Sequence, residues 1–319
     1  MRVGVVFPGQ GSQVVGMGVD VATGIPAAAE LFARASNTLG YDLLDLCRKG
    51  PEEKLRETRY SQPAIFVVNY ALAASVGEVL GTVVSAGHSF GEYCSLVLSG
   101  ALDFDEALSL VDARAEAMQA AASRAPGAMS AILGLEVEKI EAAVQRVRGE
   151  KIGRVALANF NAPQQIVISG DAAAVRRAGD LCLVAGAKRV VALNVSGAWH
   201  SELMAPAVVG FGPKVNAAQI VPPRFPVISN VDAQPYRDVA HIRHNLIRSL
   251  TAEVLWHATA LRMLEERLEL LVEFGASPVL GPLLKRLPGG VEVVTVSDRA
   301  GVEKLRGRLQ TARADSLAP

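Results

Sequence analysis

The chain has 319 residues, of which 50% are hydrophobic and 20% are charged. This length and apolar content allow a sizeable buried core, which excludes wholesale disorder. The 32 basic and 32 acidic residues balance to a net charge of zero. The composition therefore gives no indication of a protein that binds nucleic acid or an anionic membrane surface.

The sequence also lacks the marks of a membrane or secreted protein. No apolar run approaches the roughly 18 residues that a membrane span requires. The N-terminus enters a strand-like run, Val3–Phe7, without the regions of a signal peptide. Cys47, Cys94 and Cys182 are too few and too scattered for a disulfide framework or a cysteine metal site. We therefore expect a cytoplasmic protein that contacts no membrane.

Short β-branched runs alternate with longer helical patterns along most of the chain. Strands alternating with helices indicate an α/β fold with a mainly parallel sheet covered on both faces. The nearly continuous apolar character of the strands fits a sheet that is buried on both sides. The expected strands are Val3–Phe7, Val83–Ala86, Phe225–Ser229, Leu270–Phe274 and Val291–Val296.

Residues 127–195 follow a different pattern. Strand, helix, two strands, helix and strand succeed one another there, which is the ferredoxin-like order. We therefore predict a discontinuous large domain, residues 1–126 and 196–310, with a ferredoxin-like subdomain inserted at 127–195. Residues 311–319 are expected to form a flexible tail. The predicted subdomain elements are Ala128–Leu133, Val137–Val147, Val155–Asn159, Gln165–Ser169, Ala172–Ala185 and Arg189–Asn194.

The strongest local signal is Gly87-His88-Ser89-Phe90-Gly91, between an apolar strand and a helical pattern. A G-x-S-x-G motif in this context is typical of a nucleophile elbow, which presents a serine at a helix N-terminus. A glycine-rich turn with an incidental serine is the alternative. The flanking strand and helix favour the nucleophile.

A nucleophilic serine needs a base, and histidine is the usual one. His88 adjoins Ser89, and neighbours in a sharp turn usually point apart. His200 lies where the chain re-enters the large domain after the inserted subdomain, which is a natural position for a cleft. A packed or exposed histidine explains that position too, so His200 is one candidate base. The remaining histidines lie in polar, helical surroundings: His241, His244 and His257.

Arg114 lies on the apolar stripe of a helix expected from Asp103 to about Ala122. None of its neighbours three or four residues away is acidic, so an inward-facing guanidinium needs an anion from elsewhere. A salt bridge to another element, or a snorkelling stem, explains the position slightly better than a substrate carboxylate does.

Four motifs taken together resemble the malonyl-CoA:acyl-carrier-protein transacylases, the fatty-acid-synthesis enzymes related to polyketide synthase acyltransferase domains. They are Phe7–Gln13, Gly87–Glu92, Ala113–Ala115 and Gly197–Ser201. The first motif alone suggests only an ordinary turn, but all four occur in register. The likeness runs from residue 2 to about residue 300 and includes Ser61–Ala64, Asn159–Asn161 and Gln165–Gly170.

The resemblance implies an α/β-hydrolase-like large domain with an inserted ferredoxin-like subdomain, and it implies roles for several residues. Ser89 would be the nucleophile and His200 the general base. The backbone N–H groups of Gln10 and Phe90 would form the oxyanion hole. The backbone carbonyl of Ser249, where the family usually has Gln, would orient His200.

The resemblance also implies a substrate pocket. Arg114 would bind the malonyl carboxylate, and Gln62 and Gln165 would line the acyl site. Trp199 stands where the family usually has Phe, and a large aromatic residue there favours unbranched malonyl. Residues 273–278 replace the common Gly-Pro-Gly turn with a different sequence.

The activity implied is ping-pong transfer of malonyl from malonyl-CoA to the phosphopantetheine thiol of an acyl carrier protein. No cofactor and no metal is expected, and a monomer is expected. One alternative is a discrete acyltransferase of a polyketide pathway, and another is a serine acyl hydrolase or thioesterase on the same scaffold. Arg114 and a base so far from the C-terminus argue against an ordinary hydrolase.

Overall fold

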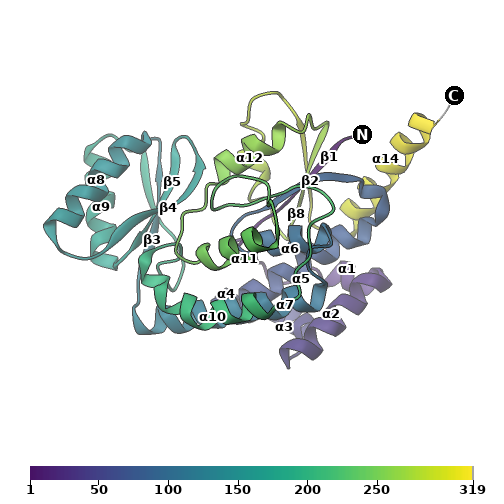
Figure 1. Cartoon of the computed structure of the whole chain (residues 1–319), viewed down its shortest axis with the longest axis horizontal. Helices are drawn as coiled ribbons and strands as arrows, with labels where there is room; N and C mark the ends of the chain where they lie inside the picture. Colours follow the sequence, from purple (N-terminus) through teal and green to yellow (C-terminus); the bar gives the residue numbers. More distant parts are fainter. Residues whose placement is uncertain (318–319) are drawn as a thin grey trace.

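The computed structural model describes residues 1–317 and contains two separate β-sheets (Figure 1). The larger sheet, sheet A, has the strand order β7-β2-β1-β8-β9, and all neighbouring strands are parallel. Its strands are β1 (Val3–Phe7), β2 (Thr82–Gly87), β7 (Val227–Ile228), β8 (Leu270–Phe274) and β9 (Glu292–Val296). All five strands expected from the sequence form, with ends that differ by at most two residues.

The central strand β1 is buried on both faces. Val5 and Phe7 belong to the large apolar core on one side of sheet A, and Val6 belongs to a second core on the other side. Alternate side chains of a strand point to opposite faces, so a strand between two cores has to be apolar throughout. This requirement explains why the apolar runs predicted the strands so closely.

Helices cover both faces of sheet A. Helix α7 begins after Asp103, whose carboxylate accepts the Glu106 N–H at 2.8 Å, as the sequence indicates. It packs against α5, and these two helices carry Arg114 and Gln62. The helices outside the inserted sheet are α1 (Val19–Gly24), α2 (Pro26–Leu39), α3 (Leu43–Lys49), α4 (Glu52–Arg56), α5 (Thr58–Val76), η1 (Glu78–Leu80), α6 (Gly91–Leu98), α7 (Phe104–Arg124), η2 (Glu202–Met204), α10 (Ala205–Ala217), α11 (Val239–Arg248), α12 (Trp256–Leu264), α13 (Gly281–Leu284) and α14 (Arg299–Leu317).

The second sheet, sheet B, is antiparallel with the strand order β4-β5-β3-β6. Together with two helices on one face it has the ferredoxin-like β-α-β-β-α-β order. Its elements are β3 (Ala128–Leu133), α8 (Val137–Glu150), β4 (Val155–Ala162), β5 (Gln165–Gly170), α9 (Ala172–Val184) and β6 (Arg189–Ala192). The predicted fold class is therefore confirmed, and the exact domain boundaries stay a prediction.

The two faces of sheet B have different neighbours. Ile132, Ile166 and Ile168 pack into a small core with α8 and α9. The alternating residues Ala131 and Val167 face the other way and line the central cavity. Sheet B thus serves as one wall of the site described below.

The end of the chain differs from the expectation of a flexible tail at 311–319. Helix α14 continues to Leu317, and residues 318–319 lie outside the described residues. Val302, Leu305 and Leu309 anchor the helix in the core. The segment beyond them lacks a continued apolar stripe, but it contains good helix formers such as alanine, arginine and leucine, which extend the helix.

Among residues 1–317, no helix combines the length and apolar character that crossing a membrane requires.

A buried carboxylate organises the segment after β8. Glu273 is 0% exposed and accepts the N–H groups of Val279, Leu280 and Gly281 at 2.9, 2.7 and 2.9 Å. It also accepts the Thr295 hydroxyl at 2.9 Å. Val279 and Leu280 line the central cavity, so this carboxylate holds part of the cavity wall.

We predict that Glu273→Ala lowers the free energy of unfolding by about 3 kcal/mol, because three N–H groups, two of them buried, lose their shared acceptor. Thr295→Val is the matched control, since it removes one donor and keeps the carboxylate, and it should cost only about 1 kcal/mol. Urea unfolding of the three proteins measures both values. Equal losses in the two variants would show that the carboxylate does not organise this segment.

Candidate active site

Ser89 lies in the sharp turn between β2 and α6, at a φ of 54° that residues other than glycine rarely adopt. Close backbone contacts require the glycines on either side. A Cβ on Gly87 would lie 1.9 Å from the carbonyl carbon of Gly91, and a Cβ on Gly91 would lie 2.4 Å from the Phe7 carbonyl oxygen. The His88 N–H donates to the same Phe7 oxygen at 2.9 Å. The turn is therefore fixed between β1 and α6.

The Ser89 hydroxyl and the His200 ring form a hydrogen bond, with 2.9 Å between Oγ and Nε2. The other ring nitrogen, Nδ1, lies 2.9 Å from the Ser249 carbonyl oxygen and 3.2 Å from that of Ala252. Carbonyl oxygens only accept, so Nδ1 carries the ring proton and Nε2 presents its lone pair to Ser89. This arrangement allows His200 to take the serine proton. Sequence analysis identified the Ser249 carbonyl and missed the one from Ala252.

Arg114 is 1% exposed, so it points inward as its helix face predicts. Its Nη1 donates to Gln62 Oε1 at 2.7 Å, and its Nη2 donates to Ser89 Oγ at 3.1 Å. Its Nε is buried and has no partner within residues 1–317. Burial lowers the pKa of the guanidinium, which nevertheless stays protonated in proteins. The structure therefore provides neutral partners for this cation and leaves one donor unsatisfied.

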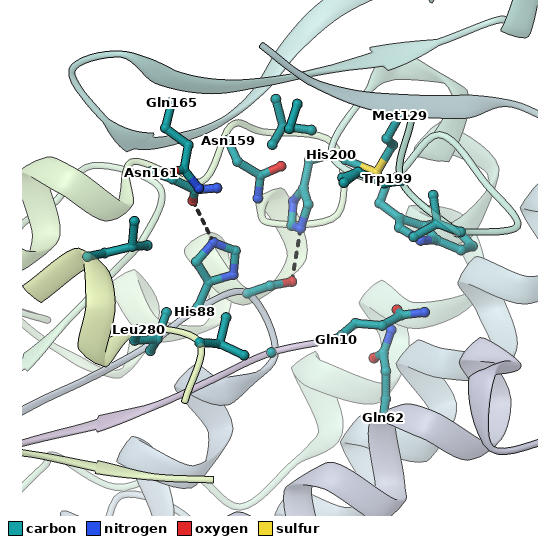
Figure 2. A pocket seen from close by; sticks show the side chains of 18 of the residues that line it. Gln10, Gln62, His88, Met129, Asn159, Asn161, Gln165, Trp199, His200 and Leu280 are labelled. Carbon is teal, nitrogen blue, oxygen red and sulfur yellow. Dashed lines mark hydrogen bonds between the residues drawn. The ribbon is translucent and has the colours of Figure 1, made fainter. Parts of the chain in front are cut away.

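A cavity of about 270 Å³ opens beside Ser89, between strands of sheet B and the turns and helices next to sheet A. In Figure 2, Gln10 and Gln62 lie on one side of the two histidines, and Asn159, Asn161 and Gln165 lie on the other. Among the residues that the structure describes, no acidic side chain lines the cavity, and Arg114 is its one permanently charged lining residue. The cavity therefore suits a ligand that carries a negative charge.

The remaining predicted pocket residues also lie at this cavity. Trp199 lines it and is 5% exposed, and its indole N–H is buried without a partner in residues 1–317. Gln165 lines it from β5, and Gln10 lines it from the turn after β1. The Gln10 side chain donates to Thr58 Oγ1 at 3.2 Å. The Phe90 side chain packs in the core, so only its backbone is available to the site.

His88 has a contact that the sequence analysis did not assign. Its Nε2 lies 2.9 Å from Asn161 Oδ1, and its ring lies beside Trp256 with 5.6 Å between centroids. Burial lowers the pKa of His88, so the neutral ring donates its Nε2 proton to Asn161. The only feature of the sequence that pointed to Asn161 was the Asn159–Asn161 segment of the resemblance. The other three histidines do not line the cavity: His241 is buried against Asp232, His244 is exposed and His257 is half-buried.

A buried acidic group lies beneath the Ser89 turn. Glu92 is 2% exposed and accepts the Tyr236 hydroxyl and, at 3.4 Å, the Asn230 N–H. Burial raises the pKa of Glu92 to about 7. Its only signal in the sequence was its place directly after the G-x-S-x-G motif.

Among residues 1–317, no group of three or more His, Cys, Asp or Glu side chains is placed to hold a metal ion.

The acyl transferase domain family matches residues 5–298, which is most of the chain. The protein therefore belongs to the acyl transferase domain family. The match and the relatives below confirm the resemblance that the motifs indicate.

The relatives carry a more particular name. The malonyl CoA-acyl carrier protein transacylase of Haemophilus influenzae is 42% identical over 299 residues, which cover 92% of this chain and 95% of that protein. The solved malonyl CoA-acyl carrier protein transacylase of Coxiella burnetii has a TM-score of 0.92 and 35% identity, and it covers 97% of this chain and 98% of its own. A malonyl-transacylase solved in complex with its type II polyketide synthase acyl-carrier protein has a TM-score of 0.92 and 39% identity, with coverage of 97% and 100%.

The protonation state of His200 leads to a pH prediction. Burial, and then the positive charge of Arg114, lower the pKa of His200 to about 3. The ring is therefore neutral throughout pH 5–8, and the rate of acyl-enzyme formation should not fall through the ordinary histidine range near pH 6.5. Quenched-flow measurement of that rate between pH 5 and 8 checks this.

The control is Glu92→Gln, because the pKa of Glu92 is about 7. If the rate of acyl-enzyme formation falls near pH 7 in the wild type but not in Glu92→Gln, the fall is due to protonation of Glu92. A tenfold loss between pH 7.5 and 5.5 that persists in the variant would contradict the low pKa of His200.

Proposed function

We propose that this protein transfers the malonyl group of malonyl-CoA to the phosphopantetheine thiol of an acyl carrier protein. The observation that supports this most strongly is Arg114, a buried cation beside Ser89 whose partners are neutral and whose Nε has no hydrogen-bond partner among the described residues. A carboxylate is the best partner for such a guanidinium. Malonyl carries one, and acetyl does not.

The loading step begins with a proton transfer. His200 Nε2 takes the Ser89 proton as Oγ attacks the thioester carbon of malonyl-CoA. The Ser249 and Ala252 carbonyls, both acceptors of the Nδ1 proton, stabilise the imidazolium that forms. The carbon–sulfur bond then breaks, the proton passes to the CoA sulfur, and a malonyl-serine ester remains.

The developing oxyanion needs donors that are already in place. Ser89 precedes α6, and the Phe90 N–H at the N-cap of that helix has no acceptor within residues 1–317. The Gln10 N–H, in the turn after β1, likewise donates to none of the described residues. We assign both N–H groups to the oxyanion hole. The Ser89 hydroxyl accepts a hydrogen bond from Arg114 Nη2. In the proposed complex it loses this hydrogen bond, because the guanidinium binds the malonyl carboxylate instead.

The second step reverses the first with a different thiol. The carrier thiol gives its proton to His200 and its sulfur attacks the ester carbon. Ser89 Oγ leaves and recovers the proton. The same residues serve both half-reactions of this ping-pong mechanism, and neither half-reaction as proposed uses a cofactor.

The acyl pocket favours a small substrate. Trp199 takes part in the wall, where its bulk supports selectivity for unbranched malonyl over branched analogues. Gln62 is held by two side chains, Arg114 and Met118, and so keeps the guanidinium in position. Gln165 lines the same space from sheet B.

The relatives support transfer to a carrier protein over hydrolysis. The similar proteins named malonyl CoA-acyl carrier protein transacylase align over nearly their whole lengths, and one malonyl-transacylase relative is solved with an acyl-carrier protein. That complex belongs to a polyketide system, so a polyketide carrier is the alternative partner. Transfer rates to a fatty-acid and to a polyketide carrier protein separate the two pathways. We further propose a cytoplasmic monomer, for which gel filtration is the test of the oligomeric state.

The first test of the function is the covalent intermediate. After brief incubation with malonyl-CoA, the intact mass of the protein should increase by one malonyl group, and the carrier protein should remove that increment. Ser89→Ala should abolish the increment while the circular dichroism spectrum is unchanged. Labelling that persists in Ser89→Ala would move the nucleophile elsewhere.

The second test concerns Arg114. A buried charge-assisted pair contributes about 1.5–3 kcal/mol, roughly ten- to a hundredfold in selectivity. Arg114→Ala should lower kcat/KM for malonyl-CoA by at least that factor and keep or improve acetyl transfer, since it removes a charge that acetyl does not pair. Arg114→Lys should recover little, because a point charge does not reproduce the bidentate fork.

Arg124→Ala is the matched control, since Arg124 lies exposed on the same helix. It should leave the ratio of the two kcat/KM values unchanged. An unchanged ratio in Arg114→Ala would mean that the guanidinium only braces the fold.

A further inference from the structure

Asn230 lies next to the Ser89 turn although it is distant in the sequence. It lies two residues beyond Ile228, the last residue of β7, and is 1% exposed. Strand β7 pairs with β2, with Ile228 opposite Ala86. Because the two strands are parallel, the residues that follow each of them meet at the same edge of sheet A. No motif in the sequence drew attention to this residue.

The polar groups of Asn230 contact three separate parts of the site. Its side-chain Oδ1 accepts the Ser89 N–H at 2.6 Å, and its backbone N–H donates to Glu92 at 3.4 Å. Its backbone carbonyl accepts the Leu255 N–H at 2.9 Å. Its Nδ2 has no partner within residues 1–317. Asn230 thus joins the nucleophile turn, the helix after it and the segment that ends at Leu255.

The contact with Ser89 satisfies a strained backbone. Ser89 has a left-handed φ, which costs an L-residue about 1–2 kcal/mol. Its N–H precedes the first turn of α6 and has no partner inside the helix. The Asn230 side chain supplies the missing acceptor. Because Asn230 Oδ1 accepts the Ser89 N–H, that N–H is not available to an oxyanion. The next N–H along the chain, that of Phe90, remains available.

The contact with Leu255 reaches the other half of the catalytic pair. Residues 249–255 carry the Ser249 and Ala252 carbonyls that hold His200 Nδ1. The Leu255 N–H at the end of this segment is bound by Asn230. A single buried residue therefore connects the backbone of Ser89 with the backbone that orients His200.

We propose that Asn230 is a positioning residue that holds the Ser89 turn and the His200-orienting segment in fixed relation. This inference rests on the roles proposed above for Ser89 and His200. It makes the side-chain oxygen the essential group, because Oδ1 accepts the Ser89 N–H and Nδ2 has no hydrogen-bond partner within residues 1–317. The residue acts through Ser89 and does not touch the acyl group.

The test compares Asn230→Ala, Asn230→Asp and Asn245→Ala. Asn245 is the matched control, because it is 2% exposed and hydrogen-bonded to Ser229 and Asp232 but not to Ser89. Asn230→Ala should lower the rate of acyl-enzyme formation about 10- to 100-fold, as expected for a misplaced nucleophile, while KM for malonyl-CoA changes less than about threefold. Asn230→Asp keeps the acceptor and should recover most of the rate.

A second measurement reports the contact itself. Hydrogen exchange of a peptide that covers residues 87–92 should be faster in Asn230→Ala and unchanged in Asn245→Ala. If Asn230→Ala does not fold, Asn230→Ser takes its place, since its side chain is too short to reach the Ser89 N–H. Asn230→Ser should then be at least tenfold slower than Asn230→Asp.

The outcomes separate this inference from the proposed function. The positioning role would be overturned if Asn230→Asp formed the acyl-enzyme no faster than Asn230→Ala, or than Asn230→Ser where that variant replaces it. Equal losses of this rate in Asn230→Ala and Asn245→Ala would overturn it too. Full malonyl labelling in Ser89→Ala or an unchanged rate in His200→Ala would instead overturn the proposed catalytic pair. A loss in Asn230→Ala with recovery in Asn230→Asp supports the inference.

Discussion

A guanidinium held in the interior without a counter-ion is the interaction on which the arrangement of this site depends. Removing such a charge from water costs several kcal/mol, and two neutral partners offset only part of that cost. Gln62 and Ser89 are those partners, and Nε of Arg114 stays unpaired within residues 1–317. Burial and this nearby positive charge together lower the pKa of His200, which keeps the proposed base neutral. No acidic side chain among the described residues lines the cavity, so the cavity wall offers this cation no carboxylate.

One short backbone segment contacts both sheet B and the proposed base, His200. The carbonyls of Ser249 and Ala252 hold His200 Nδ1. Two residues further on, Val254 pairs with the edge of β4, where its N–H donates to Ala158 and its carbonyl accepts from Phe160, at 2.8 and 2.9 Å. Sheet B is therefore attached to the same segment that orients the base. The strand that forms part of the cavity wall and the carbonyls that contact His200 are therefore joined through Val254.

The sequence predicted those features that depend on local chemistry. Strands buried on both faces had to be apolar, and two glycines had to flank Ser89, so the sheet and the turn were visible in the residues. Arg114 could be singled out in the sequence because a cation on the apolar face of a helix is rare. Asn230, Ala252 and Asn161 were not predicted, because their contacts join segments that are distant in the sequence and meet only in the fold. The predicted tail failed for the opposite reason, since α14 persists to Leu317 on helix propensity without the apolar stripe that marks a helix in a sequence.

Two departures from the family pattern lie at positions where a backbone group or a distant side chain makes the contact that matters. Ser249 contacts His200 through its backbone carbonyl, while its hydroxyl donates to the Leu246 carbonyl, so this contact with His200 does not involve the Ser249 side chain. In residues 273–278 the common Gly-Pro-Gly turn is absent, yet the Glu273 carboxylate still binds three successive N–H groups and so keeps the cavity wall in place. Trp199 differs in kind, because its side chain itself lines the cavity and its N–H is buried unpaired within residues 1–317. An unpaired buried donor is unfavourable by about 1–3 kcal/mol. The indole is therefore unfavourable for stability at its N–H, while the rest of the side chain shapes the cavity wall.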